Sequence, residues 1–262
     1  MNPGDLLAFK DWFSGFSRSF YSADPEQQKN IALKVRHTFD VCGIITGLSR
    51  DQSISPDKIL LMEASALFHD LGRFPQYARY RTFRDSISVN HGKLGADVLA
   101  ESGILGCLPE HERILITTAV RFHNAFAIPR LDDPDGTHIL KMVRDADKLD
   151  IWNIFLGFFE GGEDERASEA GLGLPDLPGY SEGVISDLHE KRTATIASLR
   201  TLNDFKLLQL SWIYDLNFQP SFRLLIEKDY IGRLIALLPA TAGINRISLM
   251  LQEYASRKAK ED

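Results

Sequence analysis

One stretch of the chain, Ala64–Arg73, places two polar side chains at the end of an otherwise small and apolar run. The run leads into adjacent His69 and Asp70, and Gly72 follows. It predicts the last turns of a buried helix, with Gly72 as the residue that stops it. An imidazole and a carboxylate at a buried helix end are costly unless something pairs with them. A divalent metal ion pairs with both, because imidazole nitrogen and carboxylate oxygen are common ligands of such ions.

Apolar residues recur at helical spacing along the chain, and no segment alternates as a half-buried strand would. Helix-start signals built around a proline stand at Asp24–Glu26, Ser55–Asp57 and Leu108–Glu110. Residues 73–90 show no clean period and are expected to form an ordered loop with short helical turns. Asp132–Gly136 has the composition of a turn. The sequence therefore predicts an all-α protein.

The chain is expected to form one helical-bundle domain over residues 1–160, with a helical extension over 161–262 packed on the same domain. Residues 161–180 combine adjacent glycines, an acidic run and two prolines, which favours a mobile loop. The C-terminal third carries aromatic residues at helix-like spacing. The simplest interpretation is that these residues pack in the core. The alternatives are that this part of the chain covers the pocket or forms a homodimer interface.

Charge and cysteine content narrow the class of protein. The net charge of −6 disfavours a general nucleic-acid surface. Cys42 and Cys107 are the two cysteines, too few for a disulfide framework or a cysteine zinc site. The N-terminus lacks the basic start and apolar run of a signal peptide, and no apolar stretch reaches membrane-spanning length. We expect a cytoplasmic protein without a membrane partner.

Further residues with metal-binding side chains stand on the apolar faces of separate predicted helices. His37, for example, shares a face with Leu33 and Val41. A single such histidine is more often a hydrogen-bonded core residue, and a single aspartate is more often the partner of a nearby basic side chain. Several together are hard to satisfy without a shared cation. The candidate metal ligands are His37, His69, Asp70, His91, His123 and Asp147. The remaining histidines, His111, His138 and His189, are expected at the surface.

The ordered set resembles the HD-domain superfamily of metal-dependent phosphohydrolases. The runs Phe68–Phe74 and Arg144–Asp150 support the resemblance, which covers about residues 30–155. In that family, residues that match His37, His69, Asp70 and Asp147 hold the first metal ion. Members with two further histidines, here His91 and His123, bind a second ion, and Asp70 bridges both. The resemblance thus implies an HD-type helical domain with divalent ions, two in number. The type of ligand does not distinguish among Mn, Fe, Co, Ni, Mg and Zn.

The resemblance also implies an enzyme that hydrolyses a phosphomonoester or phosphodiester of a small metabolite or nucleotide, using a metal-activated water. Asp70 is the expected bridge, and Arg73 and Lys148 stand close to site residues in the sequence, so that either could position the phosphate. For both basic residues the alternative is an ordinary exposed charge or ion pair. Two other functions stay open. They are a mixed-valent di-iron oxygenase, which resembles the same superfamily and uses the same ligands, and a non-catalytic, metal-stabilised binding module.

Overall fold

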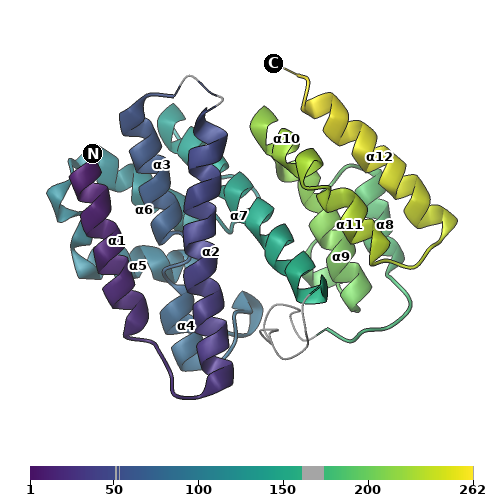
Figure 1. The fold of residues 1–262 in the computed structure, drawn as a ribbon, viewed down its shortest axis with the longest axis horizontal. Helices are drawn as coiled ribbons and strands as arrows, with labels where there is room; N and C mark the ends of the chain where they lie inside the picture. The colour runs from purple at the N-terminus through teal and green to yellow at the C-terminus, as the bar shows by residue number, and fades with distance from the viewer. Residues whose placement is uncertain (51, 53, 161–173, 262) are drawn as a thin grey trace. The chain divides into compact units, whose positions relative to one another are not determined.

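The computed structural model of the protein describes residues 1–50, 52, 54–160 and 174–261 (Figure 1). Within these residues the regular structure is α-helix and short 3-10 helix, without a strand, so the all-α prediction is confirmed. The chain divides into two compact units, Met1–Asp150 and Ile151–Asp262. The division falls inside helix α7 (Pro134–Glu160). The predicted domain boundary after residue 160 stays a prediction.

Most helices of the first unit begin where proline or an asparagine cap favours a helix start. Pro25 and Pro56 open two of them, and the side chain of Asn90 accepts a hydrogen bond from the main-chain nitrogen of Lys93 at 2.8 Å to cap a third. The helices are α1 (Pro3–Arg18), α2 (Pro25–Arg50), α3 (Pro56–Phe68), α4 (Arg73–Tyr80), α5 (His91–Ser102), α6 (Glu110–Phe122) and the first part of α7, with the 3-10 helices η1 (Asp85–Ile87) and η2 (Ile104–Cys107).

The end of α3 lies in the core of this unit. Helix α3 packs between α2 and α6, and α5 packs against α6; in Figure 1, α2 and α3 run side by side. Helix α1 covers α3 through aromatic rings, with the centroids of Phe9 and Phe68 5.5 Å apart. Fully burying one such ring stabilises the fold by about 1.5–3 kcal/mol. The packing of Phe68 therefore fixes the end of α3 in the interior of the unit, and His69 and Asp70 follow directly from it.

Two local predictions in this unit need correction. Residues 73–90, expected to be a loop with short turns, contain the regular helix α4. It forms because Phe74 and Tyr77 are buried on one face, while Pro75 stands in the first turn, where its missing N–H leaves no bond unmade. Asp132–Gly136, expected to be a turn, instead contains the start of α7. Asp133 accepts from the main-chain nitrogens of the next turn and so acts as a helix cap.

The second unit contains the end of α7, then α8 (Glu182–His189), α9 (Leu202–Ser211), α10 (Gln219–Glu227), α11 (Tyr230–Ala236) and α12 (Ala242–Lys258). Helix α8 packs on α9, and α10 and α11 pack on α12. Trp152 lies with its ring centroid 5.7 Å from that of Tyr230, and its Nε1 donates to the main-chain oxygen of Gln209 at 3.1 Å. Aromatic residues such as these thus pack in the interior of the second unit.

Residues 161–173, most of the segment expected to be a mobile loop, lie outside the described residues. None of the helices in the described part of the chain is long and apolar enough to pass through a membrane.

Candidate metal centre

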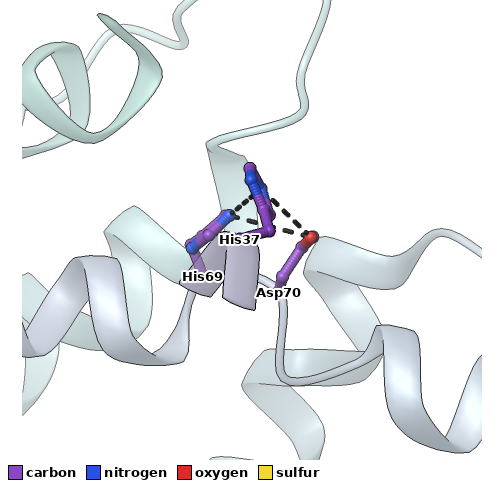
Figure 2. A group of neighbouring side chains, drawn as sticks. All are labelled: His37, His69 and Asp70. Atoms are coloured by element: carbon purple, nitrogen blue, oxygen red, sulfur yellow. Dashed lines mark hydrogen bonds and ion pairs between the residues drawn. The ribbon is translucent and has the colours of Figure 1, made fainter. Parts of the chain in front are cut away.

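The first unit brings together all of the candidate ligands, each from a different helix or helix end except the adjacent pair. His37 lies within α2, His91 begins α5 and Asp147 lies within α7. His69 and Asp70 follow the last residue of α3, and His123 follows the last residue of α6. All are buried except Asp147, which is half-buried. Figure 2 shows His37, His69 and Asp70 turned toward one another.

Asp70 connects two groups of potential ligands. Its Oδ2 lies 3.6 Å from Nε2 of His37, and its Oδ1 lies 3.3 Å from Nε2 of His91 and 3.7 Å from Nε2 of His123. Three overlapping sets have ligand atoms within 4.8 Å of one another: His37, His69 and Asp70; His69, His123 and Asp147; and Asp70, His91 and His123. One carboxylate thus faces the two groups with different oxygens.

Two of the histidines are held by carboxylates on the side away from the centre. Nδ1 of His37 lies 2.6 Å from Oδ2 of Asp150, and Nδ1 of His91 lies 2.7 Å from Oδ2 of Asp85. An ionised carboxylate only accepts hydrogen bonds, so Nδ1 is the protonated nitrogen in these contacts. The neutral tautomer of each ring then presents a bare Nε2 to the centre.

The other two histidines are held by the carbonyl groups at the helix ends they follow. Nδ1 of His69 donates to the main-chain oxygen of Ala66 at 2.7 Å, and Nδ1 of His123 donates to that of Val120 at 2.8 Å. Both acceptors lie in the last turn of a helix, where carbonyl groups have no partner within the helix. The helix end therefore fixes the ring, and Nε2 again faces inward.

When the rings are neutral, their inward Nε2 atoms are electron-pair donors placed against one another. Nε2 of His91 and Nε2 of His123 lie 2.9 Å apart, and the corresponding atoms of His37 and His69 lie 3.2 Å apart. Two bare imidazole nitrogens at such distances repel unless a proton or a cation lies between them. The carboxylates of Asp70 and Asp147 add further acceptors. This set of donors fits divalent metal ions.

The electrostatics of the cluster favour a positive charge on His37 and disfavour one on His91. Burial and the nearby Lys34 act to lower the pKa of His37, but its hydrogen bonds to Asp147 and Asp150 outweigh them and raise the pKa to about 9. Burial alone would raise the pKa of Asp70, but Lys34, His69 and other neighbours hold it well below the usual range. Burial and the charge of Arg73 lower the pKa of His91 to about 3. The Asp70 carboxylate therefore stays ionised and His91 stays neutral at neutral pH, whereas His37 holds a proton that a metal ion would displace.

Glycines allow the helix ends to approach closely enough to form this centre. A Cβ on Gly72 would lie 2.1 Å from the main-chain oxygen of His91 and 2.6 Å from the nitrogen of Gly95. A Cβ on Gly92 would lie 2.6 Å from Oδ1 of Asn124. The prediction that Gly72 stops α3 is wrong, because α3 ends at Phe68 and Gly72, with φ −66°, precedes α4. Gly72 is required for space rather than for a left-handed backbone.

Arg73 and Lys148, the basic residues expected to position a phosphate, are both engaged within the protein. Arg73 Nε lies 3.4 Å from Oδ1 of Asp70, and its Nη1 donates to Oδ1 of Asp85 at 3.0 Å and to the main-chain oxygen of Phe83. Lys148 is buried, and its Nζ donates to the main-chain oxygen of Arg144 at 3.4 Å. Their part in catalysis stays a prediction.

Sequence reasoning missed three charged residues whose side chains contact those of the candidate ligands. Lys34 Nζ lies 2.8 Å from Oδ2 of Asp70, and Asp85 and Asp150 hold histidine rings. Lys34 stands about one helical turn before His37, and Asp150 about one turn after Asp147, so helical spacing carried a signal for both. Asp85 lies in the short η1 and had no such signal. Of the histidines expected at the surface, His111 and His189 are exposed, whereas His138 is half-buried.

Together, the helical unit and its buried histidine and aspartate side chains define a metal-binding helical domain. A family model described as HD domain matches residues 35–152, a range that contains every candidate ligand. This match identifies an HD domain in this part of the chain and confirms the resemblance to the HD-domain superfamily. The branch with two metal ions stays a prediction. Comparison with curated proteins and with solved structures gave no match.

Proposed function

We propose that the protein hydrolyses phosphate esters with the help of two divalent metal ions. The observation that carries the proposal is the position of Asp70, whose two oxygens face separate groups of buried imidazoles. His37, His69, Asp70 and Asp147 would hold the first ion, and Asp70, His91 and His123 the second. When bound, such ions lower the pKa of a water molecule and neutralise charge on phosphoryl oxygens.

The charges of the chain itself support a phosphate substrate only together with cations. Asp70, Asp85, Asp147 and Asp150 bring four carboxylates to the centre, against the nearby cations of Lys34, Arg73 and the protonated His37. A phosphate group would be repelled by this excess of negative charge. With divalent ions in place, the sign at the centre reverses, and an anionic ester is attracted.

Lys34 is the basic side chain that we assign to substrate positioning. Its Nζ lies 2.8 Å from Asp70, and its side chain is 13% exposed, so it stands where the centre meets solvent. A lysine acts as a compact point charge that can hold a phosphoryl oxygen. Arg73, with Nη1 already bonded to Asp85, is better suited to holding the carboxylates in place.

In the proposed reaction, water adds to phosphorus, the ester P–O bond breaks and the leaving oxygen takes up a proton. The substrate is a small phosphorylated metabolite or nucleotide, because the net charge of −6 does not favour a nucleic-acid polymer. The proposal assigns the chain a role in the cytoplasm.

The experiment is a screen of the protein, loaded with Mn²⁺ or Co²⁺, against aryl phosphates, nucleoside phosphates, cyclic nucleotides and sugar phosphates. Asp70→Ala is expected to lower turnover by about 10³-fold or more, because it removes a ligand from both groups. His111→Ala is the matched control, since this histidine is exposed and lies outside the cluster. Absence of turnover for every ester, or iron content with oxygen-dependent turnover, would contradict the proposal; the second result would favour the oxygenase.

A further inference from the structure

Each half of the cluster contains one histidine held by a carboxylate and one held by a helix carbonyl. In the first half, Asp150 holds His37 and the main chain holds His69. In the second half, Asp85 holds His91 and the main chain holds His123. The same pairing of supports occurs twice, around the one aspartate that the two halves share.

The two kinds of support differ in what they contribute. A helix carbonyl is fixed by the backbone and is neutral. Both kinds of support select the tautomer that leaves Nε2 bare. A carboxylate in addition places negative charge behind the ring, which makes Nε2 a stronger donor of its electron pair. A carboxylate behind a ligand histidine can therefore change metal affinity without being a ligand itself.

Asp85 is bound tightly enough to fix His91. It accepts from Nδ1 of His91 at 2.7 Å, from Nη1 of Arg73 at 3.0 Å, from Nε2 of Gln76 at 2.8 Å and from Nδ2 of Asn124 at 3.0 Å. These donors come from three separate segments of the chain, so the carboxylate has little freedom to turn. Arg73 also contacts Asp70 at 3.4 Å, which ties the support of His91 to the shared aspartate.

Asp150 supports His37 from a drier position. Its side chain is 1% exposed and its Oδ2 lies 2.6 Å from Nδ1 of His37. It stands on α7, one turn beyond Asp147, which approaches Nε2 of the same ring at 3.1 Å. Helix α7 thus contacts both ring nitrogens of His37, with Asp150 at Nδ1 on the outer side and Asp147 at Nε2 on the side of the centre.

We propose that Asp150 and Asp85 are positioning residues for different metal ions: Asp150 acts through His37 on the first ion, and Asp85 acts through His91 on the second. This inference rests on the two-ion function proposed above. It predicts that the affinities for the first and the second metal ion can be changed separately by substituting residues that are not metal ligands.

The test measures the affinity for Mn²⁺ by isothermal titration calorimetry of the metal-free full chain. Asp85→Asn and Asp150→Asn are the variants. Both changes keep the shape of the side chain and remove its charge. Asp85→Asn is expected to weaken the second ion by about 10–100-fold and leave the first unchanged, and Asp150→Asn is expected to do the reverse. Asp204→Asn is the matched control, because Asp204 is a buried, hydrogen-bonded carboxylate of the other unit.

Electron paramagnetic resonance of the same samples separates positioning from a general loss of structure. Two Mn²⁺ ions that share a carboxylate couple magnetically and give a broadened spectrum. With one tight site left, either variant is expected to show the resolved hyperfine spectrum of an isolated ion, whereas Asp204→Asn keeps the coupled spectrum. If Asp150→Asn does not fold, Asp150→Glu takes its place, because it keeps the carboxylate and changes its reach.

The outcomes distinguish the two proposals. If the wild type binds two ions and both variants bind them as tightly, or if one variant weakens both ions equally, the positioning role is wrong and the proposed function stands. If the wild type itself binds fewer than two ions, the two-ion function fails, and the inference that rests on it fails as well.

Discussion

Nε2 of His91 and Nε2 of His123 face each other at 2.9 Å, although each ring is held by a hydrogen bond on its Nδ1 side. In the neutral tautomers that these bonds select, the two facing nitrogens both carry a lone pair. The protein thus holds two like groups together in its interior, an arrangement that is stable only when something positive lies between them.

Asp70→Ala is expected to remove both metal ions, whereas His91→Ala is expected to remove one. The reason is that Asp70 faces both groups of ligands and His91 only the second. Metal analysis of protein after gel filtration measures the difference as ions per chain. Equal metal content in the two variants would rule out a shared aspartate. Thermal unfolding serves as the control, because loss of Asp70 also leaves Nζ of Lys34 without this partner.

Gly72→Ala is expected to lower the free energy of unfolding by about 2 kcal/mol or more, and to weaken metal binding, because the added Cβ collides with main-chain atoms of α5. Gly43→Ala is the control. Gly43 is an exposed helical glycine with open space where the Cβ would lie, and the same change there is expected to stabilise the helix by about 0.5–1 kcal/mol. Urea unfolding measures both. A neutral Gly72→Ala would show that the helices can separate without loss.

Asp204→Asn is expected to destabilise the second unit by about 1–3 kcal/mol at neutral pH, because the carboxylate accepts from the main-chain nitrogens of Ser181, Arg200 and Thr201. Burial would raise the pKa of Asp204, but these bonds outweigh it and lower the pKa. A lowered pKa in the folded state means that the contribution is present above the unfolded pKa and is lost on acidification. The stability difference between wild type and variant should stay constant above about pH 5 and shrink below about pH 4. A difference that grows toward low pH would contradict this.

Cys107 is expected to react with a thiol reagent in the native protein, and Cys42 only after unfolding. Cys107 is exposed, whereas burial, together with the charge of Glu63, raises the pKa of Cys42 to about 12 and keeps it a thiol. Thiol titration with and without denaturant measures the two stages. Cys107→Ser should abolish the native reaction; continued labelling of that variant would show that Cys42 is accessible.

The sequence was sufficient to nominate the side chains that the structure brings together, for a physical reason. A polar residue on the apolar face of a helix must be satisfied by something, and His37, His69 and Asp147 all stood on such faces or at their ends. Their spacing also matched a family. Sequence-based reasoning was weakest where local composition has two readings. Pro134 and its acidic neighbours are typical of a turn and equally of a helix start, and the structure has the helix start.

The supporting residues could not be read from the sequence, because their role depends on tertiary contacts. Asp85 meets His91 and Asn124 only after α5 and α6 have packed together. Gly72 is likewise required because the main chain of α5 lies against it, and a local sequence pattern cannot predict such a contact. Asp150 was visible within a motif, yet a carboxylate behind a ligand has the same spacing as one in an ordinary ion pair.

The contact between His37 and Asp150 joins residues that are 113 positions apart. Closing so long a stretch of chain costs entropy before the contact can contribute, so we expect it to form late, once α2 and α7 have come together in the folded unit. A nascent or half-folded chain therefore has scattered histidines and no chelating site. A metal ion that binds the finished centre adds its binding free energy to the finished fold alone. Metal supply would then govern the lifetime of the chain against proteases, with starvation for the ion shortening it before any substrate is involved.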